Sequence, residues 1–526
     1  MSRLRNTMRQ CVRKTAFGAA ILLLCHSWLV PAVATASGAL PGIDEEDPRR
    51  IAVFTAEDVL NIALENNLDI SISKYDPLIS EADVTLAKGE FDPLWLLGFL
   101  EREEKNPTPA QYRAFGVPMD SLWNKGTTVD TSLQGKVPTG TTYSLDFASV
   151  RSESTFTSFL DEKPEYDGSA ELILTQPLLR NFGLGVNLTR TRIARNNRNI
   201  SEELVAVTIM DTLWQVLNAY WDLVFARGNL GVARQSLKNA RGLLEQNRLR
   251  AEVGHAAPVE VRQAEAGVKR REAEVVSAIA AIREAEDVLK LLLNAQESSE
   301  LWSEAIVPAD EPIMIEKMLD ENTSFEKALQ KRPELDQAKK VLENSEMLAR
   351  LNKNGLLPSI DFTGSYGYNS LRSRFDHEVE YLVRGDDWKF SYGVVGQIPL
   401  GNRLAKGTYL RSKYEADKQR LSIRQLEQII RLEVRSAIRQ IETNRKLVDT
   451  NRAATKLQER ALEDEEKRRK AGASTSYLVL EFEAELALAR SLELQALVDY
   501  RKALVSLDRA EGTILESHNI EFVSGE

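Results

Sequence analysis

Residues 408–471 contain neither proline nor glycine, and no proline occurs after Pro399. Few globular helices run so long without a residue that breaks them. At about 1.5 Å of rise per residue, one helix over this stretch is roughly 100 Å long. Its apolar residues recur at three- and four-residue steps, which indicates a seam packed against other helices. These residues are Ile423, Leu426, Ile430, Val434, Ala437, Ile441 and Val448.

A turn signal ends this long helix at residues 470–474, which read Lys-Ala-Gly-Ala-Ser. A second helical pattern then runs from Tyr477 to Leu507, and Gly512 follows it. The two patterns predict a very long antiparallel helical hairpin over residues 403–512. A chain built on such a hairpin folds into elongated parts and not into several ordinary domains.

The first 36 residues predict a secretory signal peptide. Five basic residues precede an apolar run over residues 16–30, and cleavage is expected after Ala34 or Ala36. The run is shorter than the roughly 20 residues that a membrane span needs. Both cysteines, Cys11 and Cys25, lie in this peptide, and lipidation is not expected because Leu24 precedes Cys25. Removing five basic residues changes the formal charge from -10 to -15, which disfavours nucleic-acid binding.

The next part of the chain predicts a polar leader and two short helices. We expect residues 37–54 to be loosely held, because prolines, a glycine and an acidic run fill most of them. Thr55 and Asp58 form a capping-box pattern at the start of a short helix that ends near Leu64. One amphipathic helix is predicted over residues 70–88.

Residues 91–176 change to the period of β-strands. The clearest strand is 141–147, and others are predicted near 94–101, 127–136 and 170–176. A helix of about 65 residues is then expected from Asn187 to a glycine turn near Gly254. Pro258 starts a return helix of about 38 residues, and this second long hairpin ends near residue 295.

After a connector at residues 296–324, the same order of elements repeats. A short helix (325–330), an amphipathic helix (334–353), strands (359–398) and the hairpin at 403–512 mirror the first half. We therefore expect a first repeat at 55–295, a second at 325–513 and a tail at 514–526. In each half the two shorter helices add up to the length of the long one, so we expect them to be stacked along it.

Beyond the signal peptide, no apolar run approaches the length of a spanning helix. A membrane role therefore depends on strands, which cross a bilayer only as a closed barrel. The aromatic residues of the later strands alternate with small and polar ones, as lipid-facing residues of a barrel do. They are Tyr366, Tyr368, Trp388 and Tyr392. The few strands of one chain cannot close a water-filled barrel, so we expect it to be shared between subunits.

The signal peptide, the duplicated halves, two strand-to-helix crossovers and two hairpin turns together resemble the TolC family of outer-membrane efflux proteins. The crossovers are Gln176-Pro177-Leu178 and Ile398-Pro399-Leu400-Gly401, and the turns are residues 253–264 and 471–480. The resemblance covers residues 55–515. It implies a mostly helical fold in which long hairpins form a trimeric periplasmic α-barrel, continuous with a twelve-stranded β-barrel in outer-membrane lipid.

The resemblance also implies partners and positions. The homotrimer would be a passive duct in a Gram-negative-type envelope, with an equatorial collar from the connector and termini, fed by an inner-membrane transporter through a periplasmic adaptor. The adaptor would dock at the hairpin tips, which carry Gly254, Pro258, Val261, Ala264, Gly472, Val479 and Leu480. The family places an acidic ring at the inner mouth, and Asp464 occupies that position. The alternative for Asp464 is a solvated helix face balanced by residues 467–470.

Two departures from the family pattern stand out. Phe482 occupies a position where the first half has the small Ala264, which predicts a fuller second groove. About 50 extra residues lie between the outer strands of the first repeat, so either four or six strands per subunit line the barrel.

No catalytic motif is present, and the four histidines, His26, His255, His377 and His518, are not at metal-ligand spacing. We expect no enzyme activity, cofactor or metal site. A competing hypothesis is a periplasmic or secreted coiled-coil scaffold whose strands form a soluble sandwich. Within the duct hypothesis, the cargo can be small molecules or secreted polypeptide.

Overall fold

The computed structural model describes residues 49–110, 121–155, 163–254, 257–294, 300–518 and 520. The chain divides into two units, Met1–Glu46 and Asp47–Glu526, and every described residue belongs to the second. The predicted signal peptide, both cysteines, His255, most of the leader and residues 521–526 of the tail lie outside the described residues. Within the described ranges, no helix combines the length and apolarity that crossing a membrane requires.

Two long helical hairpins form most of the fold. In the first, α7 (Thr189–Glu252) has 64 residues and α8 (Pro258–Leu292) returns along it. In the second, α13 (Arg403–Lys470) has 68 residues and α14 (Ser476–Glu511) returns. The predicted hairpins are confirmed. Each turn needs a glycine, because Gly254 and Gly472 have φ values of +76° and +78°.

Ion pairs between α7 and α8 fix the antiparallel register of the first hairpin. Arg227 contacts Glu286 at 2.8 Å, Arg241 contacts Glu272 at 3.1 Å, and Arg248 contacts Glu265 at 2.8 Å. Along this series the residue number rises on α7 by the amount it falls on α8. The two helices therefore keep one constant register over more than half of α8.

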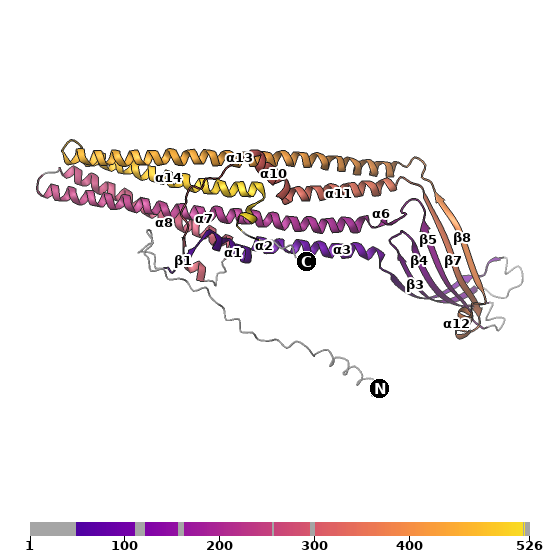
Figure 1. Ribbon diagram of the computed structural model, residues 1–526. Helices are drawn as coiled ribbons and strands as arrows, with labels where there is room; N and C mark the ends of the chain where they lie inside the picture. Colours follow the sequence, from indigo (N-terminus) through magenta and orange to yellow (C-terminus); the bar gives the residue numbers. More distant parts are fainter. Residues whose placement is uncertain are drawn as a thin grey trace, which may run out of the picture. The chain divides into compact units, whose positions relative to one another are not determined.

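Shorter helices extend each return helix along its long partner. In the first half these are α1 (Ala56–Asn66), α2 (Leu68–Ser73) and α3 (Tyr75–Lys88), and in the second α10 (Glu321–Lys331) and α11 (Pro333–Asn354). In Figure 1, α8 and α3 follow one another along α7, while α14 and α11 follow one another along α13. The expected stacking of two shorter helices along each long one is confirmed.

The start of α1 and the break after α2 have local causes. Thr55 and Asp58 form the predicted capping box, with both reciprocal hydrogen bonds present. The prediction of a single helix over residues 70–88 is wrong, because the helix is interrupted at Lys74, between α2 and α3. Pro77 explains the break: it has no N–H to donate to the carbonyl of Ser73, and its ring crowds that carbonyl.

A small parallel sheet joins the leader to the connector. Strand β1 (Ile51–Phe54) pairs with β6 (Ala305–Pro308) in register from Ile51 opposite Ala305. Asp310 follows this sheet and accepts hydrogen bonds from the Tyr220 hydroxyl and the Ala56 N–H, both at 2.7 Å. The expectation of a loosely held leader is therefore wrong for residues 51–54, because backbone pairing fixes them.

The core follows the helical seams. The largest apolar cluster centres on α7, where Tyr220, Trp221 and Leu223 are buried against α1, α8 and β6. A second cluster joins α13 and α14 through Ile430, Val434 and their neighbours. Short helical turns in the described residues include η1 (Gly89–Phe91), α6 (Leu184–Asn187), α9 (Glu300–Ser303) and α15 (Ile514–Ser517).

The remaining strands form one six-stranded antiparallel sheet in the order β2-β3-β4-β5-β7-β8. Its members are β2 (Leu94–Pro107), β3 (Ser121–Lys136), β4 (Thr142–Ser154), β5 (Glu165–Pro177), β7 (Ser359–Arg372) and β8 (Trp388–Gln397). The pairing of β5 with β7 joins the two halves of the chain. Within the described residues the sheet therefore contains six strands, where the sequence was compatible with either four or six strands per subunit.

Candidate channel wall and helical tips

One row of residues crosses all six strands of the large sheet and is entirely apolar or aromatic. Directly paired residues of an antiparallel sheet share a face. The register places in this row Trp95, Leu133, Leu145, Leu172, Tyr366 and Phe390. Every one of them is exposed, from 39% for Leu133 to 68% for Trp95. One face of the sheet is therefore a continuous apolar surface.

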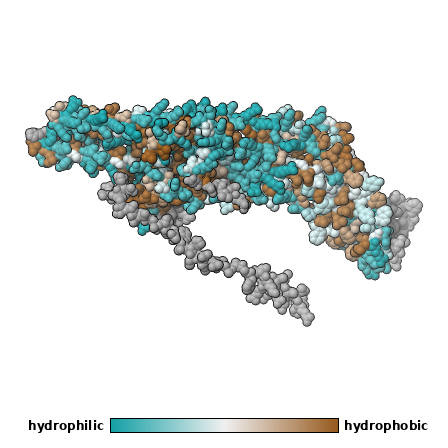
Figure 2. Space-filling model, viewed as in Figure 1, coloured by the Kyte–Doolittle hydropathy of each residue, from teal (hydrophilic) through white to brown (hydrophobic). Residues whose placement is uncertain are grey.

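The predicted membrane-facing aromatics all lie on this apolar face. Tyr368 is paired with Trp388 in the neighbouring row, and Tyr392 is paired with Gly364 in the next. The side chains of Tyr366, Trp388 and Tyr392 are 50%, 60% and 75% exposed, while Tyr368 is half-buried. Figure 2 shows the resulting apolar surface over the sheet, in contrast to the hydrophilic surface along the long helices.

The opposite face is mainly polar from β3 to β8, whereas on β2 it carries the exposed Leu94, Leu96 and Leu100. The Ser144 hydroxyl donates to the Asp146 carboxylate at 2.6 Å, and Lys389 forms an ion pair with Glu171 at 2.8 Å. The hydroxyls of Ser365 and Ser391, on the same face, are 2.8 Å apart. A sheet with one exposed apolar face and one hydrogen-bonded polar face fits a wall between lipid and water.

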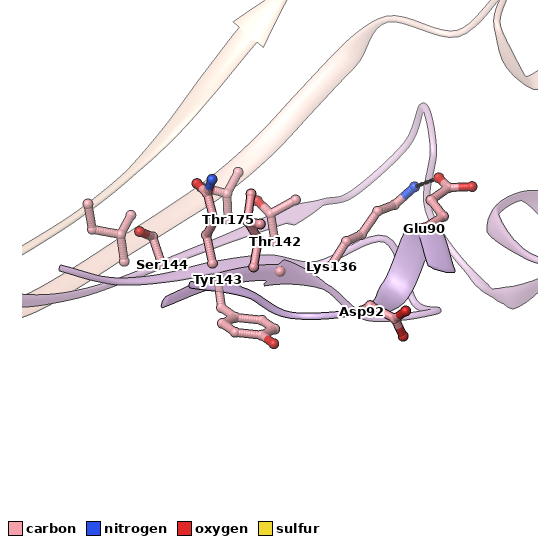
Figure 3. Close-up of a pocket in the computed structure, with 11 residues that line it drawn as sticks. Glu90, Asp92, Lys136, Thr142, Tyr143, Ser144 and Thr175 are labelled. Atoms are coloured by element: carbon pink, nitrogen blue, oxygen red, sulfur yellow. Dashed lines mark hydrogen bonds and ion pairs between the residues drawn. The ribbon is translucent and has the colours of Figure 1, made fainter. Parts of the chain in front are cut away.

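A pocket of about 330 Å³ lies where the large sheet meets the helices (Figure 3). Lys136 of β3 reaches Glu90 of η1 at 2.7 Å, and Thr142 and Ser144 point to the same side of β4. Tyr143 points away from them, as the alternation between the two faces requires. The ion pair between Lys136 and Glu90 ties a strand to the end of α3, so we interpret this pocket as part of the joint between sheet and helices.

Helix α12 (Phe375–Arg384) covers the apolar face at the end of the sheet away from the long helices (Figure 1). Its Glu378 is fully buried and accepts a hydrogen bond from the Ser149 hydroxyl at 2.8 Å. A Cβ on Gly168 would lie 2.0 Å from Glu378 Oε1, so glycine makes room for this carboxylate. The apolar face is thus bounded at that end by a helix.

The predicted crossovers lie at the sheet ends nearest the long helices. Pro177 is the last residue of β5, and Pro399 follows the end of β8 by two residues. The backbone then turns through Gly401 and Asn402, which have φ values of +84° and +45°, before α13 begins. Both prolines therefore stand where a strand gives way to a helix.

The residues predicted at the helical tips divide into exposed and buried ones. Gly254, Pro258 and Gly472 are exposed at the two turns, and Val261 and Leu480 are half-buried. Ala264 is fully buried and Val479 is 2% exposed, because α8 and α14 turn these side chains into the clusters between the hairpins. The placement of these two as surface contacts is wrong: they support the tips from inside. Phe482 is also half-buried, against one of these clusters.

Asp464 lies on the solvent-facing side of α13, with 73% of its side chain exposed, 3.4 Å from Lys467. Its neighbour Glu465 is buried and contacts Arg468 at 3.1 Å. One step along a helix turns the side chain by about 100°. That rotation separates the exposed carboxylate of Asp464 from the buried carboxylate of Glu465.

A buried polar cluster between the hairpins was missed by sequence reasoning. Glu483 of α14, Arg271 of α8 and Arg469 of α13 are all less than a tenth exposed, and Arg469 donates to the Gln246 side chain of α7 at 2.8 Å. Burial, together with the nearby Glu466, raises the pKa of Glu483 to about 7 against the opposing effect of both arginines. The available signal was a glutamate within an apolar stripe, between Val479 and Leu486.

The middle of the helical region holds a second buried charge. Glu286 of α8 is fully buried and contacts Arg49 and Arg227, each at 2.8 Å. Lys290, one turn further along α8, donates to the carbonyl of Glu304 at 2.7 Å. These contacts attach the leader and the connector to the first hairpin.

A duplicated helical-hairpin fold that carries a two-faced sheet defines the class of TolC-like channel proteins. The sequence profile of the outer membrane efflux protein family matches residues 142–295 and 325–513. The chain therefore belongs to the outer membrane efflux protein family. A search among curated proteins finds no match.

Solved structures share this fold. The CmeC outer membrane channel of Campylobacter jejuni superposes with a TM-score of 0.61 at 16% identity, covering 87% of this chain and 86% of CmeC. A membrane protein from Pseudomonas aeruginosa gives 0.63 at 18% identity, covering 87% and 90%. The open state of the MtrE outer membrane channel of Neisseria gonorrhoeae gives 0.60 at 16%, covering 88% and 89%. At these identities the likeness concerns the fold.

Proposed function

We propose that this protein is the outer-membrane exit duct of a tripartite efflux or type I secretion system. In this proposal the chain is a homotrimer, is exported by its signal peptide without lipidation, and passes substrates passively. The observation that carries the proposal is the row of exposed apolar residues across all six strands, from Trp95 to Phe390. In water such a surface would be costly, whereas outer-membrane lipid would cover it.

The difference between the two faces of the sheet indicates which face would contact lipid and which would contact water. The apolar face would meet outer-membrane lipid, and the face with Asp146, Glu171 and Lys389 would line the aqueous path. The long hairpins of the repeats at 55–295 and 325–513 would continue that path into the periplasm. The leader and the connector at 296–324, which pair through β1 and β6, would form an equatorial collar.

The partners follow from the position of the tips. A periplasmic adaptor joined to an inner-membrane transporter would dock at the turns, where Gly254, Pro258 and Gly472 are exposed and Val261 and Leu480 partly so. Ala264 and Val479 would hold the tip in shape. Asp464 would form the acidic ring at the inner mouth, because its carboxylate is exposed near the end of α13.

Membrane fractionation and conductance measurement test this function. A duct should remain with outer membranes after a high-salt wash, require detergent for extraction, and give discrete conductance steps in planar bilayers. The competing coiled-coil scaffold would wash off with salt and give no conductance. If salt released the protein from the membranes and planar bilayers showed no conductance, the channel proposal would be contradicted.

The tip proposal has its own test. A cysteine placed next to Gly472, in place of the exposed Ala473, gives one thiol in the mature chain, since Cys11 and Cys25 lie in the predicted signal peptide. Crosslinking at this thiol in intact cells should capture a periplasmic adaptor and, with it, an inner-membrane transporter. The identity of that transporter would separate small-molecule from polypeptide cargo.

A further inference from the structure

The outer strands of the first half are full members of the large sheet. Pairing of β2 with β3 runs from Leu94 opposite Gln134 to Pro107 opposite Ser121. Pairing of β3 with β4 is equally continuous along β4. The family profile, however, matches only from residue 142, where β4 begins. The strands β2 and β3 therefore add to the four that lie within the matched region.

The addition of β2 and β3 makes β2, and not β4, the free edge of the sheet on that side. Because β3 occupies the outer side of β4, the backbone groups of β4 are not available to another chain. The free edges within the described sheet are those of β2 and β8. In hydrocarbon each unpaired N–H or C=O costs several kcal/mol, so both edges need a partner strand.

We infer that β8 of one copy docks along β2 of the next, so that three copies close an eighteen-stranded barrel instead of the twelve-stranded one that the resemblance implied. This inference rests on the proposed function, because it requires a trimer in the outer membrane. The occupant of each edge is a second copy of this chain.

The strand directions favour this contact. Six consecutive antiparallel strands place β2 and β8 in opposite directions. A copy that adds its β2 to the β8 of its neighbour therefore continues the antiparallel alternation around the ring. An odd number of strands would have forced a parallel contact at each junction.

The faces of the two edges also match. On β2 the apolar face carries Trp95, Leu97 and Phe99, which are 68%, 70% and 70% exposed. On β8 the same face carries aromatic side chains, and Trp388 and Phe390 stack with ring centres 5.5 Å apart. Joining these edges keeps the apolar surface continuous across the junction between copies, as a lipid-facing wall requires.

The added strands change the width of the path. At equal strand tilt the diameter of a barrel grows roughly in proportion to the number of strands, so eighteen give about one and a half times the diameter of twelve. The face of β2 and β3 opposite the apolar row would line the added arc, with Ser132 and Gln134 on β3 and Leu96 and Leu100 on β2. The outer part of this duct would accordingly accept bulkier cargo than a twelve-stranded barrel.

Disulfide crosslinking between copies tests the junction. Ser391→Cys on the polar face of β8 is combined with Leu96→Cys, Leu100→Cys or Arg102→Cys on the same face of β2. The matched set combines Ser391→Cys with Ser144→Cys, Asp146→Cys or Ala148→Cys on β4. Oxidation in outer membranes is followed by non-reducing electrophoresis. We expect at least one of the three combinations with β2 to give covalent dimers and trimers, and none of the three combinations with β4 to do so.

An internal control shows whether the sheet is formed. Ser365→Cys with Ser391→Cys joins directly paired residues of one chain, whose hydroxyls are 2.8 Å apart, and should close within the monomer. If this control closes and a bifunctional amine crosslinker captures the trimer in the same membranes, then a crosslink from β4, or the absence of any crosslink from β2, overturns the eighteen-stranded barrel and leaves the duct intact. If the control stays open and no trimer forms, the proposed function fails as well.

Discussion

Glu171 of β5 and Lys389 of β8 form an ion pair of 2.8 Å across Gly367 of the intervening strand β7. The three residues stand in one row on the polar face, and the glycine leaves the space over which the two side chains meet. The pair links the last strand of the first half to the last strand of the second. A side chain at residue 367 would interrupt that link.

Gly367→Ala should weaken the sheet at the junction between the two halves. A Cβ at this position would lie 2.5 Å from the carbonyl oxygen of Ala170, a backbone atom that cannot move aside easily. We expect a lower dissociation temperature of the detergent-solubilised trimer, measured by electrophoresis after heating. Gly393→Ala on β8 is the control, because its Cβ would meet no atom within 4 Å. Equal temperatures for both variants would contradict the packing argument.

Arginine substitutions distinguish the two faces of the sheet. Phe390→Arg places a charge on the apolar face, where it should destabilise membrane insertion by about 2–4 kcal/mol near the middle of the bilayer. Ser391→Arg places the same charge on the polar face of the same strand. We expect less Phe390→Arg protein in outer-membrane fractions, with Ser391→Arg near the wild-type amount. Equal amounts of the two variants in outer-membrane fractions would contradict the assignment of the apolar face to lipid.

Glu483 should make the stability of the helical region depend on pH. Its pKa is raised from 4.5 to about 7 by burial, so between these values the folded chain holds a proton that the unfolded chain releases. The free energy of unfolding should therefore fall as pH rises through this window, by up to about 3 kcal/mol. Glu483→Gln should be more stable than the wild type at pH 8 and similar at pH 4.5.

Thermal unfolding followed by the helical circular-dichroism signal, at several pH values, measures this dependence. Glu485→Gln is the matched control, since Glu485 is exposed two residues along the same helix. A wild-type pH profile that survives in Glu483→Gln would assign the dependence to another group.

Glu286→Ala should loosen the attachment of the leader and the connector. The substitution leaves Arg227, with 14% of its side chain exposed, beside a cavity and without its carboxylate. Breaking a buried pair on one side typically costs about 3–5 kcal/mol. We expect faster proteolysis within residues 49–54 and a lower unfolding temperature. Glu284→Ala, an exposed position on the same helix, should change neither, and matching losses in the two variants would argue against the buried pair.

Asp464→Asn should raise the conductance of the closed duct if three copies of Asp464 narrow its inner mouth. Neutralising the ring removes three negative charges and should also reduce the preference for cations. Single-channel recording in planar bilayers measures both quantities. Glu463→Gln is the control, because Glu463 also contacts Lys467, at 2.9 Å. Unchanged single-channel behaviour in Asp464→Ala would remove Asp464 from the gate and leave it a solvated helix residue.

The helical architecture could be predicted from the sequence because its signals are local or periodic. The absence of proline and glycine over residues 408–471, the turn glycines Gly254 and Gly472, and the capping box at Thr55 each act within a few residues. The break at Lys74 was overlooked although Pro77 signals it, because the apolar period continues through the proline. The alternation of aromatic with small or polar residues along β7 and β8 likewise predicted a sheet with two different faces.

The sequence by itself determined the long hairpins, the duplication and the two-faced strands, because backbone propensity and side-chain period are properties of short segments. Only the tertiary structure decided that all six strands join one sheet, with β2 and β8 as its edges. It also decided that Ala264, Val479 and Glu483 are buried while Asp464 is exposed. Strand order and burial depend on contacts between segments hundreds of residues apart, and no short stretch of sequence contains both partners.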